Sequence, residues 1–215
     1  MTAPAERKLK IGVLALQGAF SEHVNLLKRI QDEVSDAVLI KTQSELEDPS
    51  LDALILPGGE STSMALVAER SGLMEPLRKW VKGGRPVWGT CAGMILLSNA
   101  ANKTKIGGQS LIGGLDVTVQ RNAFGTQLDS FVEDLSGPLF GPTPFQAVFI
   151  RAPIIDTIDS DAVEVLVTVD HGGKQVPVAV RQGSILATAF HPELTHDDRV
   201  HRYFLDMARK TINKV

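Results

Sequence analysis

The only cysteine of this 215-residue chain lies in the stretch "PVWGTCAGM", with Gly89 two residues before it and Gly93 two residues after it. This pattern is typical of a nucleophile elbow, a tight corner between a strand and a helix that exposes one reactive side chain. Glycines on both sides let neighbouring backbone come close to the corner. The stretch therefore predicts Cys91 as a nucleophile at the carboxyl end of a strand, where open α/β sheets bind ligands. A buried structural cysteine is the alternative.

A cysteine nucleophile needs a basic partner at neutral pH. A free thiol has a pKa of about 8.5, and a helix N-terminus alone shifts such a value by less than about one unit. The stretch "ATAFHPEL" offers His191 after an apolar strand, with Glu193 two residues later. Residues two apart in an extended segment point to the same side, so Glu193 is expected to orient the imidazole. His191 alone could be a satisfied core histidine, but with Cys91 the set predicts a Cys–His–Glu triad.

A third stretch, "LILPGGESTSM", predicts a strand that ends in a glycine turn before a helix. Gly58 and Gly59 would let backbone N–H groups face a ligand, as an oxyanion hole requires. A phosphate-binding loop is the rival interpretation, but the G-x-x-x-x-G-K-[ST] spacing is missing and Glu60 would repel phosphate. The alternative without a catalytic role is a turn that only starts a helix, with Ser61 or Thr62 as its cap.

The order of strand and helix signals indicates how these stretches are positioned. Strands are expected at 10–16, 37–41, 51–57 and 86–89, and helices at 21–33 (capped by Ser21), 62–70 and 73–84. Further strands are expected at 115–120, 145–151, 163–169, 176–181 and 184–190, with a loop at 136–145 and a final helix at 197–213. Alternating strands and helices predict a parallel sheet, and the strand-rich second half predicts antiparallel additions. We expect one α/β domain over residues 1–215, with three layers: a mixed, mainly parallel sheet and helices on both faces.

Composition and charge exclude several classes of protein. The net charge of −3 and the lack of a dense basic patch argue against nucleic acid as a partner. No apolar run approaches the length of a membrane helix, and the start "MTAPAERK" lacks the apolar core of a signal peptide. One cysteine forms no intramolecular disulfide, so a cytoplasmic setting is expected. The histidines match no zinc spacing, and four are expected on the surface: His23, His171, His196 and His201.

Several stretches together resemble a known family. "PGGES", "GTCAG" and "FHPEL" are similar to the motifs of class I glutamine amidotransferases, which use a Cys–His–Glu triad. "GVLALQGAFSEH", "QRNAFGTQLDSF" and "FIRAP" resemble the PdxT family, the glutaminase subunits of pyridoxal 5′-phosphate synthase. The resemblance runs in order from about Lys10 to the final helix. Thr126 and Val132 depart from the family's frequent arginine and glutamate.

The resemblance implies a fold, a reaction and a set of residues. The fold would be the flavodoxin-like one of class I glutamine amidotransferases. Cys91 would be the nucleophile, His191 the base and Glu193 the orienting acid, with the backbone N–H groups of Gly59 and Ala92 as oxyanion donors. Six residues would contact glutamine: Gly59, Glu60, Ser61, Arg121, Ile150 and Arg151. A guanidinium suits the substrate carboxylate, because it donates two parallel hydrogen bonds.

The implied activity is hydrolysis of L-glutamine to glutamate and ammonia, with no cofactor. The ammonia would pass to a (β/α)8-barrel synthase subunit of the PdxS type in a large hetero-oligomer that makes pyridoxal 5′-phosphate, in vitamin B6 biosynthesis. Three alternatives stay open at this point. One is a glutaminase-like cysteine peptidase or chaperone, another is a scaffold without catalysis, and the third is an amidotransferase subunit of a different pathway.

Overall fold

The computed structural model describes residues 7–102, 108–121 and 130–214. Its centre is a seven-stranded sheet in the order β10-β11-β12-β4-β3-β1-β2. The strand bounds are β1 Leu9–Leu14, β2 Val34–Ile40, β3 Ala53–Leu56, β4 Val87–Thr90, β10 Glu164–His171, β11 Lys174–Gln182 and β12 Ile185–Thr188. Neighbouring strands are parallel from β12 to β2, whereas β10, β11 and β12 pair antiparallel. The predicted mixed, mainly parallel sheet is confirmed.

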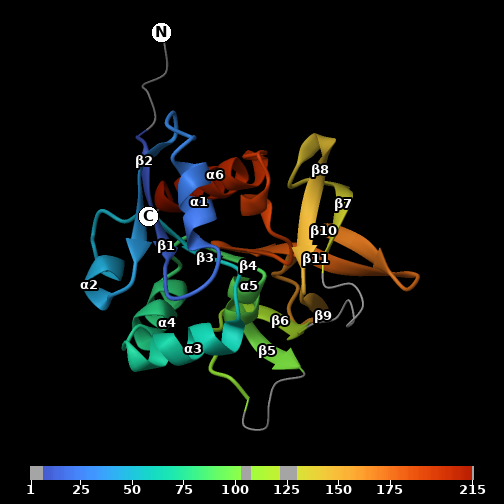
Figure 1. Cartoon of the computed structure of the whole chain (residues 1–215), viewed down its shortest axis with the longest axis horizontal. Coiled ribbons are helices and arrows are strands. Elements are labelled where there is room, and N and C mark those ends of the chain that lie inside the picture. The colour runs from blue at the N-terminus through green and yellow to red at the C-terminus, as the bar shows by residue number, and fades with distance from the viewer. Residues whose placement is uncertain (1–6, 103–107, 122–129, 215) are drawn as a thin grey trace.

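Helices cover both faces of this sheet. Their bounds are α1 Phe20–Leu27, α2 Gln43–Leu46, α3 Ser61–Arg70, α4 Met74–Lys82, α5 Ala92–Leu97 and α6 Arg199–Ile212, with a 3-10 turn η1 at Pro192–Leu194. Figure 1 shows α1 and α6 on one side of the central strands and α3, α4 and α5 on the other, which gives the three expected layers. No helix in the described part of the chain is both long and apolar enough to cross a bilayer.

The second half adds two smaller sheets. Strands β5 Ser98–Asn102, β6 Leu115–Gln120 and β9 Ile154–Ile158 form one, and the hairpin of β7 Ser130–Gly137 and β8 Gly141–Ile150 forms the other. The expected loop at 136–145 is wrong, because it includes the end of β7 and the start of β8. Pro142 and Pro144 lie in β8 at exposed positions. A two-stranded hairpin leaves one side of each strand unpaired, so a missing N–H costs little there.

Local caps differ from the sequence expectation at two helices. Helix α1 begins after Ala19 with no side-chain cap, so Ser21 does not cap it, and it ends earlier than expected, at Leu27. Helix α3 is capped by Glu60, whose carboxylate accepts from the N–H groups of Thr62 at 3.1 Å and Ser63 at 2.7 Å. The cap is therefore neither Ser61 nor Thr62, because the carboxylate reaches the same orphan donors from the preceding residue.

The strand order decides where functional stretches meet. Strands β12, β4, β3 and β1 are neighbours and run in one direction, so their carboxyl ends lie at one edge of the sheet. Each is followed within three residues by a residue of interest: His191, Cys91, Gly58 and Gln17. Apart from Lys10 in β1, the residues of these strands are buried, so the sheet is a rigid base for that edge.

Candidate active site

Cys91 occupies the predicted elbow between β4 and α5. Its backbone has φ 47° and ψ −102°, in the region that L-residues rarely adopt, and such strain costs about 1–3 kcal/mol. The two flanking glycines are required by packing. A Cβ on Gly89 would lie 2.5 Å from the backbone of Gly93, and a Cβ on Gly93 would lie 2.0 Å from the carbonyl oxygen of Leu56. The Cys91 N–H donates to the carbonyl of Thr188 at 2.8 Å, which fixes the elbow to β12.

His191 and Glu193 form the predicted contact directly after β12. His191 Nδ1 lies 2.7 Å from Glu193 Oε1, and both residues are buried. The segment is not extended as expected, because Pro192–Leu194 forms the 3-10 turn η1. The turn still brings the carboxylate back to the ring. The backbone N–H of His191 also donates to the carbonyl of Val148 at 2.8 Å, which ties the backbone of His191 to strand β8.

The charges of this pair depend on one another. Burial by itself lowers the pKa of His191, but the adjoining Cys91 and Glu193 outweigh burial and raise it to about 10. Burial raises the pKa of Glu193, and the protonated His191 that donates to it outweighs that effect and holds the pKa below its usual range. The ring therefore carries a proton beside the sulfur and a carboxylate. A protonated imidazole held by a carboxylate beside a cysteine is the arrangement that nucleophilic cysteine catalysis uses.

The Gly58–Gly59 turn fits between His191 and the segment after β1. A Cβ on Gly58 would lie 2.3 Å from Cε1 of His191, and one on Gly59 would lie 2.4 Å from Gln17 Oε1. The Gly58 carbonyl accepts from the Ala19 N–H at 3.0 Å, and Gln17 Oε1 accepts from the Glu60 N–H at 2.8 Å. The turn is thus held on both sides, and because both of its residues are glycines, its backbone faces the cleft directly.

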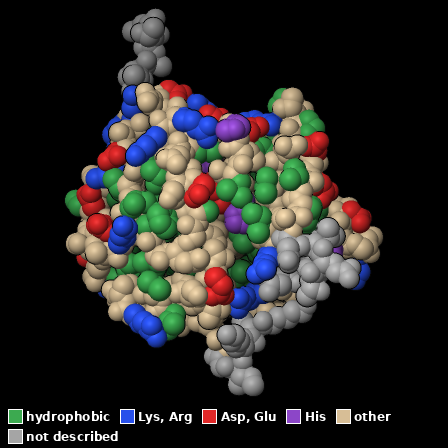
Figure 2. All heavy atoms as spheres, viewed as in Figure 1, with side chains coloured by type: hydrophobic (Ala, Val, Ile, Leu, Met, Phe, Trp, Pro, Cys, Tyr) green, Lys and Arg blue, Asp and Glu red, His purple; other side chains and the backbone are tan. Residues whose placement is uncertain are grey.

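A cleft of about 540 Å³ opens at this edge of the sheet. Nine residues with sequence-predicted roles line it: Gly58, Gly59, Glu60, Ser61, Cys91, Arg121, Ile150, Arg151 and His191. Two others lie behind it, since Glu193 is covered by His191 and Ala92 is the buried first residue of α5. The Ala92 N–H belongs to the first turn of that helix, where N–H groups have no partner within the helix. Figure 2 shows histidine and hydrophobic side chains gathered at the centre of one face, with acidic and basic side chains close by.

Opposite charges meet at the rim of this cleft. Arg121 donates to Glu60 Oε1 at 3.0 Å and to Thr62 Oγ1 and Gln109 Oε1 at 3.1 Å each. Burial opposes ionisation of Glu60, but hydrogen bonds from Ser63 and Thr62 lower its pKa to about 2. On the other side, Arg151 has φ 44° just after β8. Two arginines and one glutamate therefore line the cleft around Cys91.

Sequence reasoning missed four residues at or behind the cleft. Gln17 lines the cleft, and its position just after the first strand could have indicated a place at the carboxyl edge of the sheet. Gln109 holds Arg121, and nothing in its sequence neighbourhood pointed to that role. The expectation of a surface position is wrong for His23 and His201, which are 0% exposed. Their spacing from Leu27 and Leu205 is one helix turn, which places them on the buried stripes of α1 and α6. Residues 122–129, including Thr126 and most of the "QRNAFGTQLDSF" stretch, lie outside the described residues.

Comparison with known proteins gives consistent matches along almost the whole chain. Residues 13–210 match the SNO glutamine amidotransferase family. The pyridoxal 5′-phosphate synthase subunit PdxT of Herpetosiphon aurantiacus is 45% identical over 199 residues, covering 93% of this chain and 100% of the relative. The PdxT subunit of Bacillus cereus (strain AH187) is 50% identical over 203 residues, covering 94% and 96%. A crystal structure of a glutamine amidotransferase is 44% identical, with a TM-score of 0.80 over 93% of this chain and 98% of the other.

Proposed function

Because this chain belongs to the SNO glutamine amidotransferase family, we propose that it is the glutaminase subunit of a pyridoxal 5′-phosphate synthase. It hydrolyses L-glutamine to glutamate and ammonia, and a partner synthase subunit uses the ammonia. The observation that carries the reaction is the meeting of Cys91, His191 and Glu193 at one edge of the sheet, in a cleft with two arginines. The pathway rests on the names of the relatives.

The first step is attack on the side-chain amide. The Cys91 thiolate adds to Cδ of glutamine, and the electron pair of the C=O bond moves onto oxygen. The N–H groups of Gly59 and Ala92 stabilise that oxyanion. Loss of one such donor costs about 3 kcal/mol in other enzymes, which is a hundredfold or more in rate.

The second step releases ammonia and then glutamate. His191 gives its proton to the departing nitrogen as the C–N bond breaks, which leaves a glutamyl thioester on Cys91. The neutral imidazole then takes a proton from water, and the hydroxide attacks the thioester carbon. The C–S bond breaks, glutamate leaves, and the thiolate–imidazolium pair is restored. Glu193 holds the ring in the tautomer that both transfers need.

Substrate recognition follows from the charges at the rim. The guanidinium groups of Arg121 and Arg151 bind the α-carboxylate of glutamine, and the Glu60 carboxylate binds its α-ammonium group. Gly59, Ser61 and Ile150 complete the contacts through backbone and surface shape. The volume of about 540 Å³ suits a small molecule of this kind. No cofactor takes part in these steps.

The partner in this proposal is a (β/α)8-barrel synthase subunit of the PdxS type, and the two chains form a hetero-oligomer in the cytoplasm. Residues 1–215 act as one glutaminase domain. An amidotransferase subunit of another pathway would use the same triad, so the site alone does not select the pathway. The high identity to two PdxT subunits favours vitamin B6 synthesis over that rival.

The deciding experiment measures glutamate release from glutamine with and without a PdxS-type subunit from the same source. A rate that rises when the barrel subunit is added supports the reaction and the pathway. Strong glutamate release that does not change when the barrel subunit is added supports the glutaminase reaction and rejects the proposed partner. No release in either sample, with a complex demonstrated by gel filtration, rejects the reaction and returns the chain to a scaffold role.

A further inference from the structure

A row of buried polar side chains continues behind the triad. Glu193 Oε1 binds His191, while Glu193 Oε2 lies 3.4 Å from His23 Nε2. His23 Nδ1 in turn lies 2.9 Å from His201 Nε2. His23 comes from α1 and His201 from α6, and both are fully buried. The proposed reaction uses His191 and Glu193 and gives no task to the two histidines behind them.

The Glu193 carboxylate needs hydrogen-bond donors, and this need determines which ring nitrogen of His23 and of His201 carries the hydrogen. Among the described residues, Glu193 Oε2 has no partner at hydrogen-bond geometry, and the His23 ring lies against it with Nε2 at 3.4 Å. A buried carboxylate oxygen without a donor is costly. If His23 Nε2 carries the hydrogen, its Nδ1 accepts from His201 Nε2–H, and His201 Nδ1 is left as a bare lone pair. That nitrogen has no partner in the described part of the chain.

The opposite tautomers give a worse arrangement. His23 Nε2 would then turn a lone pair toward the Glu193 carboxylate, and His201 would bury an N–H with no acceptor. Thr90 Oγ1 lies 3.3 Å from His23 Nε2 at hydrogen-bond geometry, so the Nε2–H is shared between Thr90 Oγ1 and the adjoining Glu193 Oε2. The favoured hydrogen therefore points at the end of β4, where Thr90 and Glu193 lie together.

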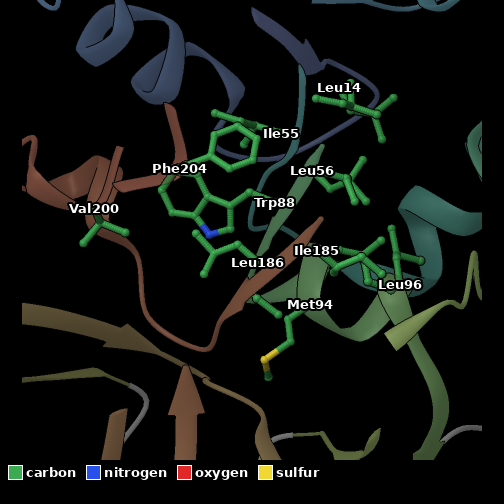
Figure 3. Close-up of a cluster of buried hydrophobic side chains, with 14 of the residues drawn as sticks. Leu14, Ile55, Leu56, Trp88, Met94, Leu96, Ile185, Leu186, Val200 and Phe204 are labelled. Atoms are coloured by element: carbon green, nitrogen blue, oxygen red, sulfur yellow. The ribbon is translucent and has the colours of Figure 1, made fainter. Parts of the chain in front are cut away.

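Burial keeps both rings neutral and packing keeps them still. Desolvation lowers the pKa of His23 and of His201 to about 3. Trp88 contacts both rings edge-on, with centroid distances of 5.4 Å to His23 and 4.8 Å to His201. Figure 3 shows Trp88 in the middle of the buried cluster, beside Phe204 and Leu186. The row is thus rigid, uncharged and attached to the one carboxylate that orients the catalytic imidazole.

We propose that His23 is a positioning residue for the glutaminase reaction, donating Nε2–H to Glu193 Oε2 so that the carboxylate keeps the orientation that aligns His191. His201 selects the tautomer of His23 that makes this bond. The inference rests on the proposed function, because it concerns the same triad. The physical reason is that a glutamate held at one oxygen only can rotate about its side chain, and catalytic groups need placement to within about 0.5 Å.

Two substitutions of His23 separate positioning from packing. In His23→Gln the amide nitrogen lies near the place of Nε2 and keeps the donor to Glu193. In His23→Asn it lies near the place of Nδ1 and faces His201 instead. We expect His23→Asn to lower kcat 10- to 100-fold with the KM for glutamine within about twofold, and His23→Gln to retain most of the kcat. Equal losses in both variants, or no loss in His23→Asn, would overturn the proposal.

The pH profile gives a readout that packing alone does not move. The groups that face Glu193 are His191 from the end of β12 and His23 from α1, and His201 of α6 lies behind His23 with Arg29 near it. A carboxylate that loses a donor is easier to protonate. The acid limb of kcat/KM should therefore move to higher pH in His23→Asn and stay in place in His23→Gln. An unmoved limb in His23→Asn contradicts the proposal.

A second pair covers the case in which a His23 variant does not fold. His201→Gln keeps a donor near Nε2 toward His23 Nδ1, and His201→Leu removes it. We expect a lower kcat in His201→Leu than in His201→Gln, and equal values reject the role of His201 and His23. All assays use the complex with the synthase subunit and begin with wild type. An inactive wild type counts against the proposed function, whereas an active wild type with indifferent variants counts only against this inference.

Discussion

Replacement of Gly58 by alanine tests the geometry of the site with the smallest possible change. A Cβ at this position would lie 2.3 Å from Cε1 of the His191 ring. An ordinary carbon–carbon contact needs about 3.5 Å, so the imidazole must move by about 1 Å. Gly58 is not among the glycines with positive φ, so the added methyl strains no backbone torsion. The effect should therefore act on the ring.

The expected size follows from that displacement. A misplacement of about 1 Å in a catalytic group can lower a rate about 100-fold, which corresponds to about 2.7 kcal/mol in the activation free energy. We expect kcat for glutamate release, measured with the synthase subunit present, to fall by about that factor. The KM should change much less, because the ring and not the rim has moved. Overpacking should also lower the free energy of unfolding by about 1–3 kcal/mol.

A matched control is Gly83→Ala at the end of α4. It makes the same chemical change at φ −73°, away from the cleft, and its Cβ would lie 3.1 Å from the carbonyl of Lys79. Urea unfolding of both variants separates loss of fold from loss of alignment. If Gly58→Ala keeps kcat within threefold of wild type while folded, the close fit of the turn against His191 is not needed for catalysis.

Three further predictions concern the nucleophile, the rim and the buried histidines. Cys91→Ala should reduce glutamate release to background while glutamine binding, followed by calorimetry, persists; measurable turnover would remove Cys91 from the mechanism. Arg121→Lys should raise the KM about tenfold with a smaller effect on kcat, because a single ammonium cannot replace the fork that reaches Glu60, Thr62 and Gln109; an unchanged KM would show that Arg121 does not hold substrate. Burial lowers the pKa of His23 and of His201 to about 3. Below about pH 6.5 these two histidines therefore bind protons in the unfolded chain but not in the folded chain. Their contribution is fully present above about pH 6.5 and is lost as the pH falls toward 3, by about 1.4 kcal/mol per histidine and pH unit. The slope of unfolding free energy against pH, measured between pH 6.5 and 5, should be smaller in His201→Leu by one such amount, and an equal slope would contradict the burial argument.

Local chemistry in the sequence was enough to single out Cys91, His191 and Glu193 as candidates and to find the main strands along the chain. The elbow is predictable because a cysteine with a glycine two residues away on each side, as at Gly89, Cys91 and Gly93, is typical of a tight strand-to-helix corner and of few other local structures. Strands β3, β4 and β12 are predictable because they are short apolar runs bounded by glycine, proline or polar residues. The hairpin β7–β8 was harder, since its prolines and glycines have the composition of a loop while long-range pairing makes them a strand. Helix caps failed where a neighbouring carboxylate, Glu60, reached the free N–H groups first.

The tertiary structure alone decided which residues meet. Strand β4 pairs with β12 through Thr90 and Thr188, two residues far apart in the chain, and this register places His191 beside Cys91. No local spacing encodes that register, because pairing between distant strands depends on the whole packed core. The same packing brings Gln17 against Gly59 and buries His23 and His201 behind Glu193. From its sequence position alone, a histidine is expected at the surface. Only the contacts around it in the folded structure show whether it is buried and therefore neutral.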